Sequence, residues 1–149
     1  MWELYPKDTP QVFGALFNWT STAIFKELFG RANLGEGGLK TEGIDIVQFP
    51  ILSPDSLTAS QLQNLEKSFN EMSEREIKSI FEEFGLPKPN KDYSNIYPDD
   101  ISLDNVLPDR RELDEIVFEA IGLTEGEQLE VYRAVVELVK NRLVKARSV

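Results

Sequence analysis

The stretch from Val12 to Phe29 constrains the fold more than any other part of this chain. A helix built from it would carry large apolar side chains on nearly every side: Val12, Phe13, Leu16, Phe17, Trp19, Ile24, Phe25, Leu28 and Phe29. A helix that is apolar all round has to be buried on all sides. We therefore expect one continuous helix at the centre of the domain, from near Thr9, with Pro10 in its first turn, to Gly30.

Polar residues argue against a membrane span here. Asn18, Lys26 and Glu27 interrupt the stretch, and it is shorter than the roughly 20 uninterrupted apolar residues that cross a bilayer. The first residues also lack the basic and then apolar segments of a secretory signal. We expect a cytoplasmic protein with no membrane partner.

The composition removes several kinds of chemistry. The 149 residues are enough for one domain with a hydrophobic core. The chain has no cysteine and no histidine, which excludes disulfides, thiolate sites and the commonest general base and transition-metal ligand. Any catalysis would have to use carboxylates, lysine or hydroxyl groups.

The net charge of −10 is unevenly distributed. Residues 42–129 contain twenty acidic and seven basic residues, whereas the two signs balance in residues 1–41 and bases prevail in residues 130–149. Phosphate binding needs positive charge. The two ends are therefore the regions whose charge would permit contact with nucleic acid.

Four further helices are predicted from their start and stop signals. Thr58, Ser73 and Thr124 each begin a capping box, which a Gln or Glu three residues later completes, and Asp109 caps another helix. The predicted spans are 58–72, 73–84, 109–122 and 124–146.

A short strand is predicted after the glycine-rich residues. Ile44, Ile46 and Val47 suit a strand, and Pro50 ends any ladder because it lacks a donor.

The predicted fold is mainly α (α+β), with about five helices and a small β element near residues 38–49. One domain covers residues 1–149. It contains a first helix, a Gly-rich turn and a short strand (1–52), a helical pair (53–85), a long connection that apolar side chains hold to the core (86–108) and a C-terminal helical hairpin (109–149).

The last helix carries an apolar seam whose members are three and four residues apart: Leu129, Tyr132, Val136, Val139, Leu143 and Ala146. This spacing fits packing on the chain's own core, and it also fits a homodimer. The sequence leaves both alternatives open.

Residues 35–41, GEGGLKT, come close to a nucleotide-binding loop without matching one. The phosphate-loop pattern needs a glycine directly before its Lys-Thr pair, and Leu39 stands there. The dinucleotide pattern counted from Gly35 needs a glycine where Lys40 stands. The acidic residues 99–109 lack the spacing of a calcium loop, and no catalytic motif is found. We predict no catalytic, cofactor-binding or metal-binding residue in this chain.

Three stretches follow one another closely: ALFNWTST (15–22), FKELFGRANLGEGGLK (25–40) and GIDIVQFPI (43–51). Further along come RELDEIVFEAIGLT (111–124) and VYRAVVELV (131–139). Together they resemble the C-terminal region of adenine-specific DNA methyltransferases from restriction-modification systems. In that family such a helix and glycine-rich segment lie near the end of the target-recognition portion.

The resemblance implies a role in placing DNA rather than in methyl transfer. The family's S-adenosylmethionine loop and its Asn/Asp-Pro-Pro-Tyr/Phe motif, which holds the flipped adenine, do not occur here. We therefore expect a non-catalytic C-terminal fragment of a larger enzyme, in which a separate methyltransferase catalytic domain binds S-adenosylmethionine.

The resemblance also points to Arg31, Asn33 and Lys40 as the DNA-binding residues, because a recognition region positions DNA through phosphate and base contacts. The glycines between them would let backbone amides approach a phosphate. The alternative is a helical docking or dimerisation module with no DNA contact of its own, in which these glycines only allow a tight turn.

Overall fold

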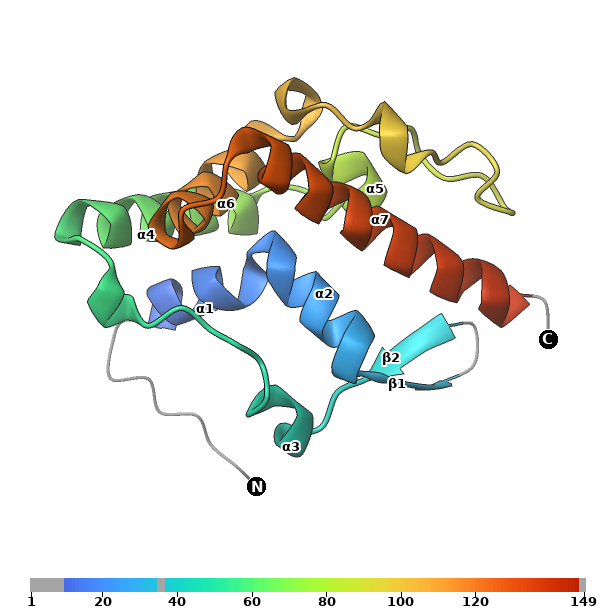
Figure 1. The fold of residues 1–149 in the computed structure, drawn as a ribbon, viewed down its shortest axis with the longest axis horizontal. Coiled ribbons are helices and arrows are strands. Elements are labelled where there is room, and N and C mark those ends of the chain that lie inside the picture. Colours follow the sequence, from blue (N-terminus) through green and yellow to red (C-terminus); the bar gives the residue numbers. More distant parts are fainter. Residues whose placement is uncertain (1–9, 35–36, 148–149) are drawn as a thin grey trace.

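The computed structural model describes residues 10–34 and 37–147 (Figure 1). This part is mainly helical with a small β element, as the sequence predicts, and the β element is one antiparallel pair of strands. Its elements are α1 Pro10–Asn18, α2 Thr20–Phe29, β1 Arg31–Leu34, β2 Gly38–Lys40, α3 Gly43–Ile46, η2 Pro54–Ser56, α4 Ala59–Glu74, α5 Ile80–Glu83, η3 Pro98–Asp100, η4 Leu103–Asn105, α6 Pro108–Ile121 and α7 Glu125–Arg147. Within the described residues, none of the helices combines the length and apolar character that a bilayer crossing demands.

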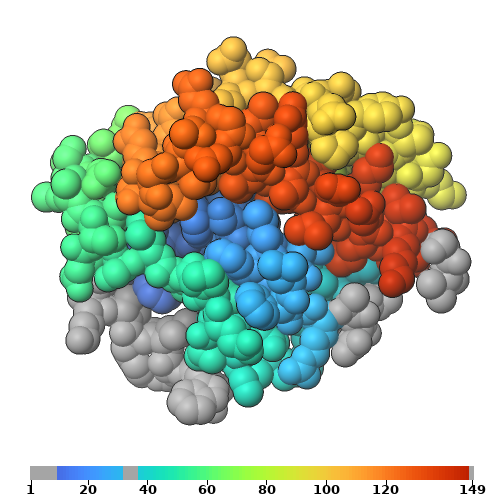
Figure 2. All heavy atoms as spheres, viewed as in Figure 1, coloured from blue at the N-terminus to red at the C-terminus, as the bar shows by residue number. Residues whose placement is uncertain are grey.

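The first two helices run through the middle of the molecule, and the longer helices pack against them (Figure 1). α4 packs on both α1 and α6, and α7 packs along α2. In the space-filling view, blue residues of the first two helices are flanked by green residues of α4 and by the red α7 (Figure 2). The core between these elements includes the fully buried side chains Leu16, Leu65, Phe84, Ile96, Leu113, Phe118 and Tyr132.

The prediction of one continuous first helix is wrong at a single residue. Trp19 is extended, with φ −64° and ψ 154°, and divides the helix into α1 and α2. The Trp19 amide still donates to the Ala15 carbonyl, and the Thr22 amide donates to the Trp19 carbonyl, both at 3.1 Å. The chain therefore bends at Trp19 without a loop.

Two side chains one turn apart on α6 satisfy backbone groups that this bend leaves free. Arg110 donates to the carbonyl of Asn18, the last residue of α1. Asp114 accepts the amide of Thr20, the first residue of α2, at 2.7 Å, and the hydroxyls of Thr20 and Tyr132 donate to the same carboxylate. A cation at a helix C-terminus and an anion at a helix N-terminus also match the helix dipoles. We conclude that α6 stabilises the bend.

Arg110 also belongs to a largely buried ion network. Its Nε and Nη2 each lie 2.7 Å from Oε2 of Glu83. The other Glu83 oxygen lies 3.2 Å from Nη2 of Arg75, whose Nε donates to Asp109. Buried charges are tolerated when they are paired and hydrogen-bonded, and here they join the end of α4, α5 and the start of α6.

The small β element is confirmed, but the strand predicted over residues 44–47 is wrong. The strands are β1 and β2, which come earlier, and Gly43–Ile46 forms the short helix α3. A capping box explains the helix, because the Glu42 side chain accepts a backbone amide of α3 and the Asp45 side chain accepts the Glu42 amide at 2.8 Å. This local cap prevails over the strand preference of the two isoleucines.

Two of the three predicted capping boxes are confirmed. The side chains of Thr58 and Thr124 each accept an amide three residues later, and the residue at that position bonds back to the Thr58 or Thr124 amide. The box predicted at Ser73 is wrong, because α4 continues to Glu74. The box that opens α5 is instead at Ser79.

The start of α6 also differs from the prediction. Its N-cap is Leu107, and Pro108 takes the first helical position. A backbone N–H at that position would have no partner within the helix, so proline, which lacks one, is favoured there. Asp109, predicted as the cap, lies in the first turn and binds Arg75. The predicted end of the helix at Gly122 is confirmed by the left-handed backbone there.

Burial along the first two helices is less complete than the sequence predicts. Val12 and Leu16 are buried, whereas Leu28 is 62% exposed and Phe29 is 37% exposed at the end of α2. A helix of apolar residues therefore ends in an apolar surface.

The seam of α7 packs on this chain's own core. Tyr132, Val136 and Val139 are buried, and Leu129 and Leu143 are partly buried against the same core. Of the two alternatives for the seam, own-core packing is the one found in the structure.

The connection predicted over residues 86–108 lies against the core, and it ends at Leu107 because Pro108 belongs to α6. Tyr93, Ile96, Ile101 and Val106 are buried. The Leu107 amide donates to the Glu83 carbonyl at 2.9 Å, which fixes the end of the connection beside α5.

Two glycines after α5 and α6 allow a matched test of this packing. Gly85 and Gly122 share a left-handed backbone, with φ 79° and 78°. A Cβ at Gly85 would clash with the Asn105 carbonyl oxygen, whereas one at Gly122 would meet nothing within 4 Å. We predict that Gly122→Ala lowers the free energy of unfolding by about 1 kcal/mol and Gly85→Ala by about 3 kcal/mol. Denaturant unfolding measures both, and equal losses would contradict the contact at Asn105.

Candidate functional site

Two of the predicted DNA-binding residues face each other on the strand pair. Arg31 in β1 and Lys40 in β2 are cross-strand partners. Their side chains are 50% and 56% exposed. The fold thus brings together two cations that are nine positions apart in sequence, at the edge of the molecule beyond α2 (Figure 1).

Acidic neighbours bind both cations. Lys40 Nζ lies 2.9 Å from Glu42, and Arg31 lies 3.6 Å from Glu42 and 3.7 Å from Asp45. The hydrogen bond from Lys40, followed by the charges of Lys40 and Arg31, lowers the pKa of Glu42 below its ordinary value. The site is therefore a compact cluster of two cations and two carboxylates.

The third predicted residue, Asn33, has its backbone in β1. Its side chain lies outside the described part of the structure. The structure therefore neither joins it to the cluster nor separates it from the cluster.

The strand pair is fixed to the body of the protein by Arg142 near the end of α7. Its Nε and Nη2 form a bidentate pair with Glu27 of α2 at 2.7 to 3.0 Å, and Nη1 donates to the Gly37 carbonyl. Gly37 has φ 78°, and a Cβ there would lie 3.1 Å from Ala146. The anchor therefore depends on a glycine at this position as well as on the arginine.

No local signal in the sequence could have identified this anchor. Glu27 and Arg142 are 115 positions apart, and no sequence pattern links the two. Only the packing of α7 along α2 brings them together.

An apolar surface lies next to the cluster. We define it as Leu28 and Phe29 at the end of α2 with Ile44 and Val47 at α3, which are 62%, 37%, 64% and 78% exposed, respectively. The rings of Phe29 and Phe49 are 6.0 Å apart, and this contact places the segment after α3 against the end of α2. Large apolar side chains that are exposed in this way are candidates for an interaction surface.

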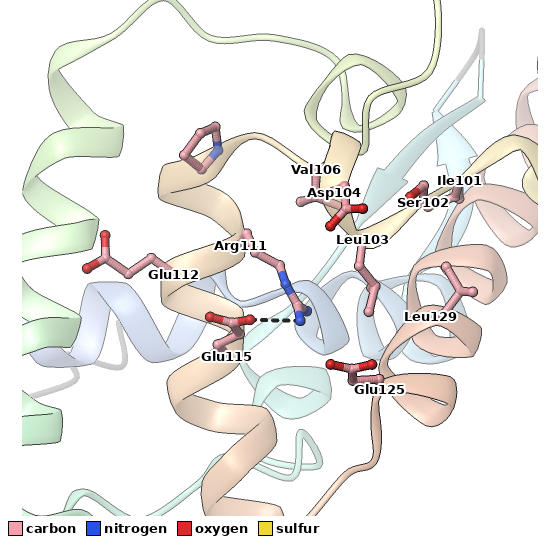
Figure 3. A pocket seen from close by; sticks show the side chains of 11 residues that line it. Ile101, Ser102, Leu103, Asp104, Val106, Arg111, Glu112, Glu115, Glu125 and Leu129 are labelled. Atoms are coloured by element: carbon pink, nitrogen blue, oxygen red, sulfur yellow. Dashed lines mark ion pairs between the residues drawn. The ribbon is translucent and has the colours of Figure 1, made fainter.

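An open groove of about 740 Å³ lies between the 101–106 segment, α6 and the start of α7 (Figure 3). Its apolar wall comprises Ile101, Leu103, Val106 and Leu129, and its polar wall includes Asp104, Glu112, Glu115 and Glu125. Arg111 is held by Glu115 at 2.8 Å and by Gln128 at 2.8 Å. Excess acidic charge repels phosphate, so the groove does not suit DNA.

The described residues contain no group of three or more acidic side chains placed to hold a metal ion. Asp45, Glu83 and Asp114 are the buried carboxylates among the described residues, and their partners are other side chains and backbone groups of this chain.

Comparisons with known proteins identify no relative: no family model matches the chain, and neither a curated protein nor a solved structure does.

The anchor leads to a prediction about the strand pair. Arg142→Ala should lower the free energy of unfolding by about 2 kcal/mol, because it removes charge-assisted bonds from a largely buried pair. Amide hydrogen exchange in β1 and β2 should become faster than exchange in α4. Arg133→Ala, which removes the pair with the 69% exposed Glu130 on the same helix, should cost less than about 1 kcal/mol. Unchanged exchange in β1 and β2 would contradict the anchoring role.

Proposed function

We propose that this chain is a non-catalytic C-terminal domain that positions DNA for an adenine-specific DNA methyltransferase of a restriction-modification system. In this proposal a separate catalytic domain binds S-adenosylmethionine and transfers the methyl group. The chain itself supplies no cofactor site and acts in the cytoplasm together with the rest of the enzyme.

The observation that carries the proposal is the cross-strand pair Arg31 and Lys40 on an anchored hairpin. Both side chains are about half exposed, and Arg142 ties the hairpin to α2 and α7. Phosphate contacts of this kind set the position and register of a protein on DNA without reading sequence. A hairpin bound to the core in this way would transmit that register to an attached domain.

The charges around the pair determine how DNA would bind. Glu42 and Asp45 already bind the two cations, so a phosphate would have to replace a carboxylate. Binding by the isolated chain should therefore be weak and strongly salt-dependent. The acidic groove is well separated from the hairpin, because Leu129 and Arg142 are thirteen residues and about 20 Å apart along α7.

A second function is favoured by the apolar surface of Leu28, Phe29, Ile44 and Val47. A docking module would cover this surface with the methyltransferase catalytic domain or with a second copy of the chain. It would need no DNA contact, and Arg31 and Lys40 would then only stabilise the turn with Glu42.

The DNA proposal predicts a specific loss of affinity. In fluorescence anisotropy with a labelled duplex at low salt, Arg31→Ala/Lys40→Ala should weaken binding by roughly tenfold or more and lower the slope of log affinity against log salt by about two, since two phosphate contacts are lost. Glu42→Gln should strengthen binding, because it removes the competing charge and keeps an oxygen that can cap α3.

The matched control is Lys78→Ala/Lys88→Ala, which changes the net charge equally at two exposed positions elsewhere. This variant should bind like the wild type. Equal losses in both double variants would indicate a general charge effect and would contradict the site. Absent DNA binding, together with self-association that Val47→Asp abolishes, would favour the docking module.

A further inference from the structure

The acidic groove between the 101–106 segment, α6 and the start of α7 is large enough to hold a ligand (Figure 3). Its volume is about 740 Å³, which lies within the range of roughly 300 to 1,000 Å³ that ligand pockets occupy. Each of the three parts supplies residues to the lining. The groove is therefore formed by the packed fold and not by one loop alone.

The groove carries a negative charge that its own cation does not cancel. Four of its eleven lining residues are acidic and one is basic, which gives a net charge of −3. The cation is Arg111, and it is already held by Glu115 and Gln128, each at 2.8 Å. Asp104 and Glu125 are exposed, and neither forms an ion pair within the part of the chain that the structure describes. These two carboxylates are therefore open to the cations of a partner.

Apolar side chains lie between these two carboxylates. Figure 3 shows Leu103 between Asp104 and Glu125, with Leu129 beside it. Leu103 and Leu129 are only partly buried against the core, so each leaves apolar surface in the groove. Covering this surface with an apolar side chain of a partner would be favourable. The groove thus combines an apolar centre with a negative charge on either side.

We propose that this groove binds a basic segment of a partner protein in which lysine or arginine residues flank an apolar residue. The apolar side chain packs on Leu103 and Leu129, and the cations on either side pair with Asp104 and Glu125. Charge complementarity of this kind sets the orientation of a partner and suppresses acidic competitors. An extended segment that lies across the groove reaches both carboxylates.

Other occupants suit the groove less well. A small organic cation would stay largely in water, because binding sites for small ligands bury most of the ligand surface and this groove is open. The basic end of α7 in a second copy of the chain is already engaged, since Lys140 donates to the Ile96 carbonyl and Arg142 binds Glu27. The proposal does not depend on the DNA role proposed for the hairpin.

Synthetic peptides test this proposal on the full chain. In fluorescence anisotropy at low salt, a labelled Lys-Lys-Leu-Leu-Lys-Lys peptide should bind saturably, and Glu-Glu-Leu-Leu-Glu-Glu should not bind. Lys-Lys-Ser-Ser-Lys-Lys should bind about tenfold more weakly, because it lacks the apolar contact. Spermidine is the small-cation probe. Equal binding of the leucine and serine peptides, or displacement by spermidine as strong as that by unlabelled leucine peptide, would overturn the proposal.

Variants locate the binding in the groove. Asp104→Asn/Glu125→Gln should weaken binding of the lysine-leucine peptide by about fivefold, because two exposed charge pairs are lost. The matched control Glu76→Gln/Glu137→Gln neutralises two exposed acids outside the groove and should bind like the wild type. The same loss in both double variants, or no loss in either, would contradict the groove as the site. Wild-type self-association that Asp104→Asn/Glu125→Gln abolishes would also overturn the proposal, because a second copy would then occupy the groove.

Discussion

The buried carboxylate of Asp114 is the contact on which the rest of this fold depends. It is fully buried between α2, α6 and α7, and it accepts the Thr20 amide and the hydroxyls of Thr20 and Tyr132. One turn earlier on α6, Arg110 donates to the last carbonyl of α1. Two oppositely charged side chains therefore complete the two helix ends that meet at Trp19. Burying a carboxylate is unfavourable unless its oxygens are bound, and here three donors meet that need.

The position of the strand pair that carries Arg31 and Lys40 follows from this arrangement in a few steps. The bend directs α2 along α7, and that packing brings Glu27 to Arg142. Arg142 in turn holds the Gly37 carbonyl, which fixes the strand pair that carries Arg31 and Lys40. A loss at the bend should therefore reach the hairpin through the packing of α2 on α7.

The sequence predicts those features whose determinants lie close together in the chain. The capping boxes at Thr58 and Thr124 and the end of α6 at Gly122 are of this kind, and so is the mainly helical class. The bend at Trp19 is different, because its stabilising partners lie more than ninety positions away. The anchor at Arg142 is equally remote. Arg31 and Lys40 were reached through a family resemblance, and their pairing across β1 and β2 needed the structure.

The most direct test of this account is the pH dependence of stability in wild type and Asp114→Asn. Burial raises the pKa of Asp114 above its ordinary value, so the folded state holds this proton more tightly than the unfolded state. The contribution of Asp114 to the free energy of unfolding is then complete below about pH 4. This contribution decreases as pH rises through the folded pKa, by up to about 1.4 kcal/mol per pH unit. Denaturant unfolding between about pH 4 and 8 should show wild type losing stability relative to Asp114→Asn, followed by a plateau. A difference between the two proteins that does not change with pH would contradict a buried carboxylate at the bend.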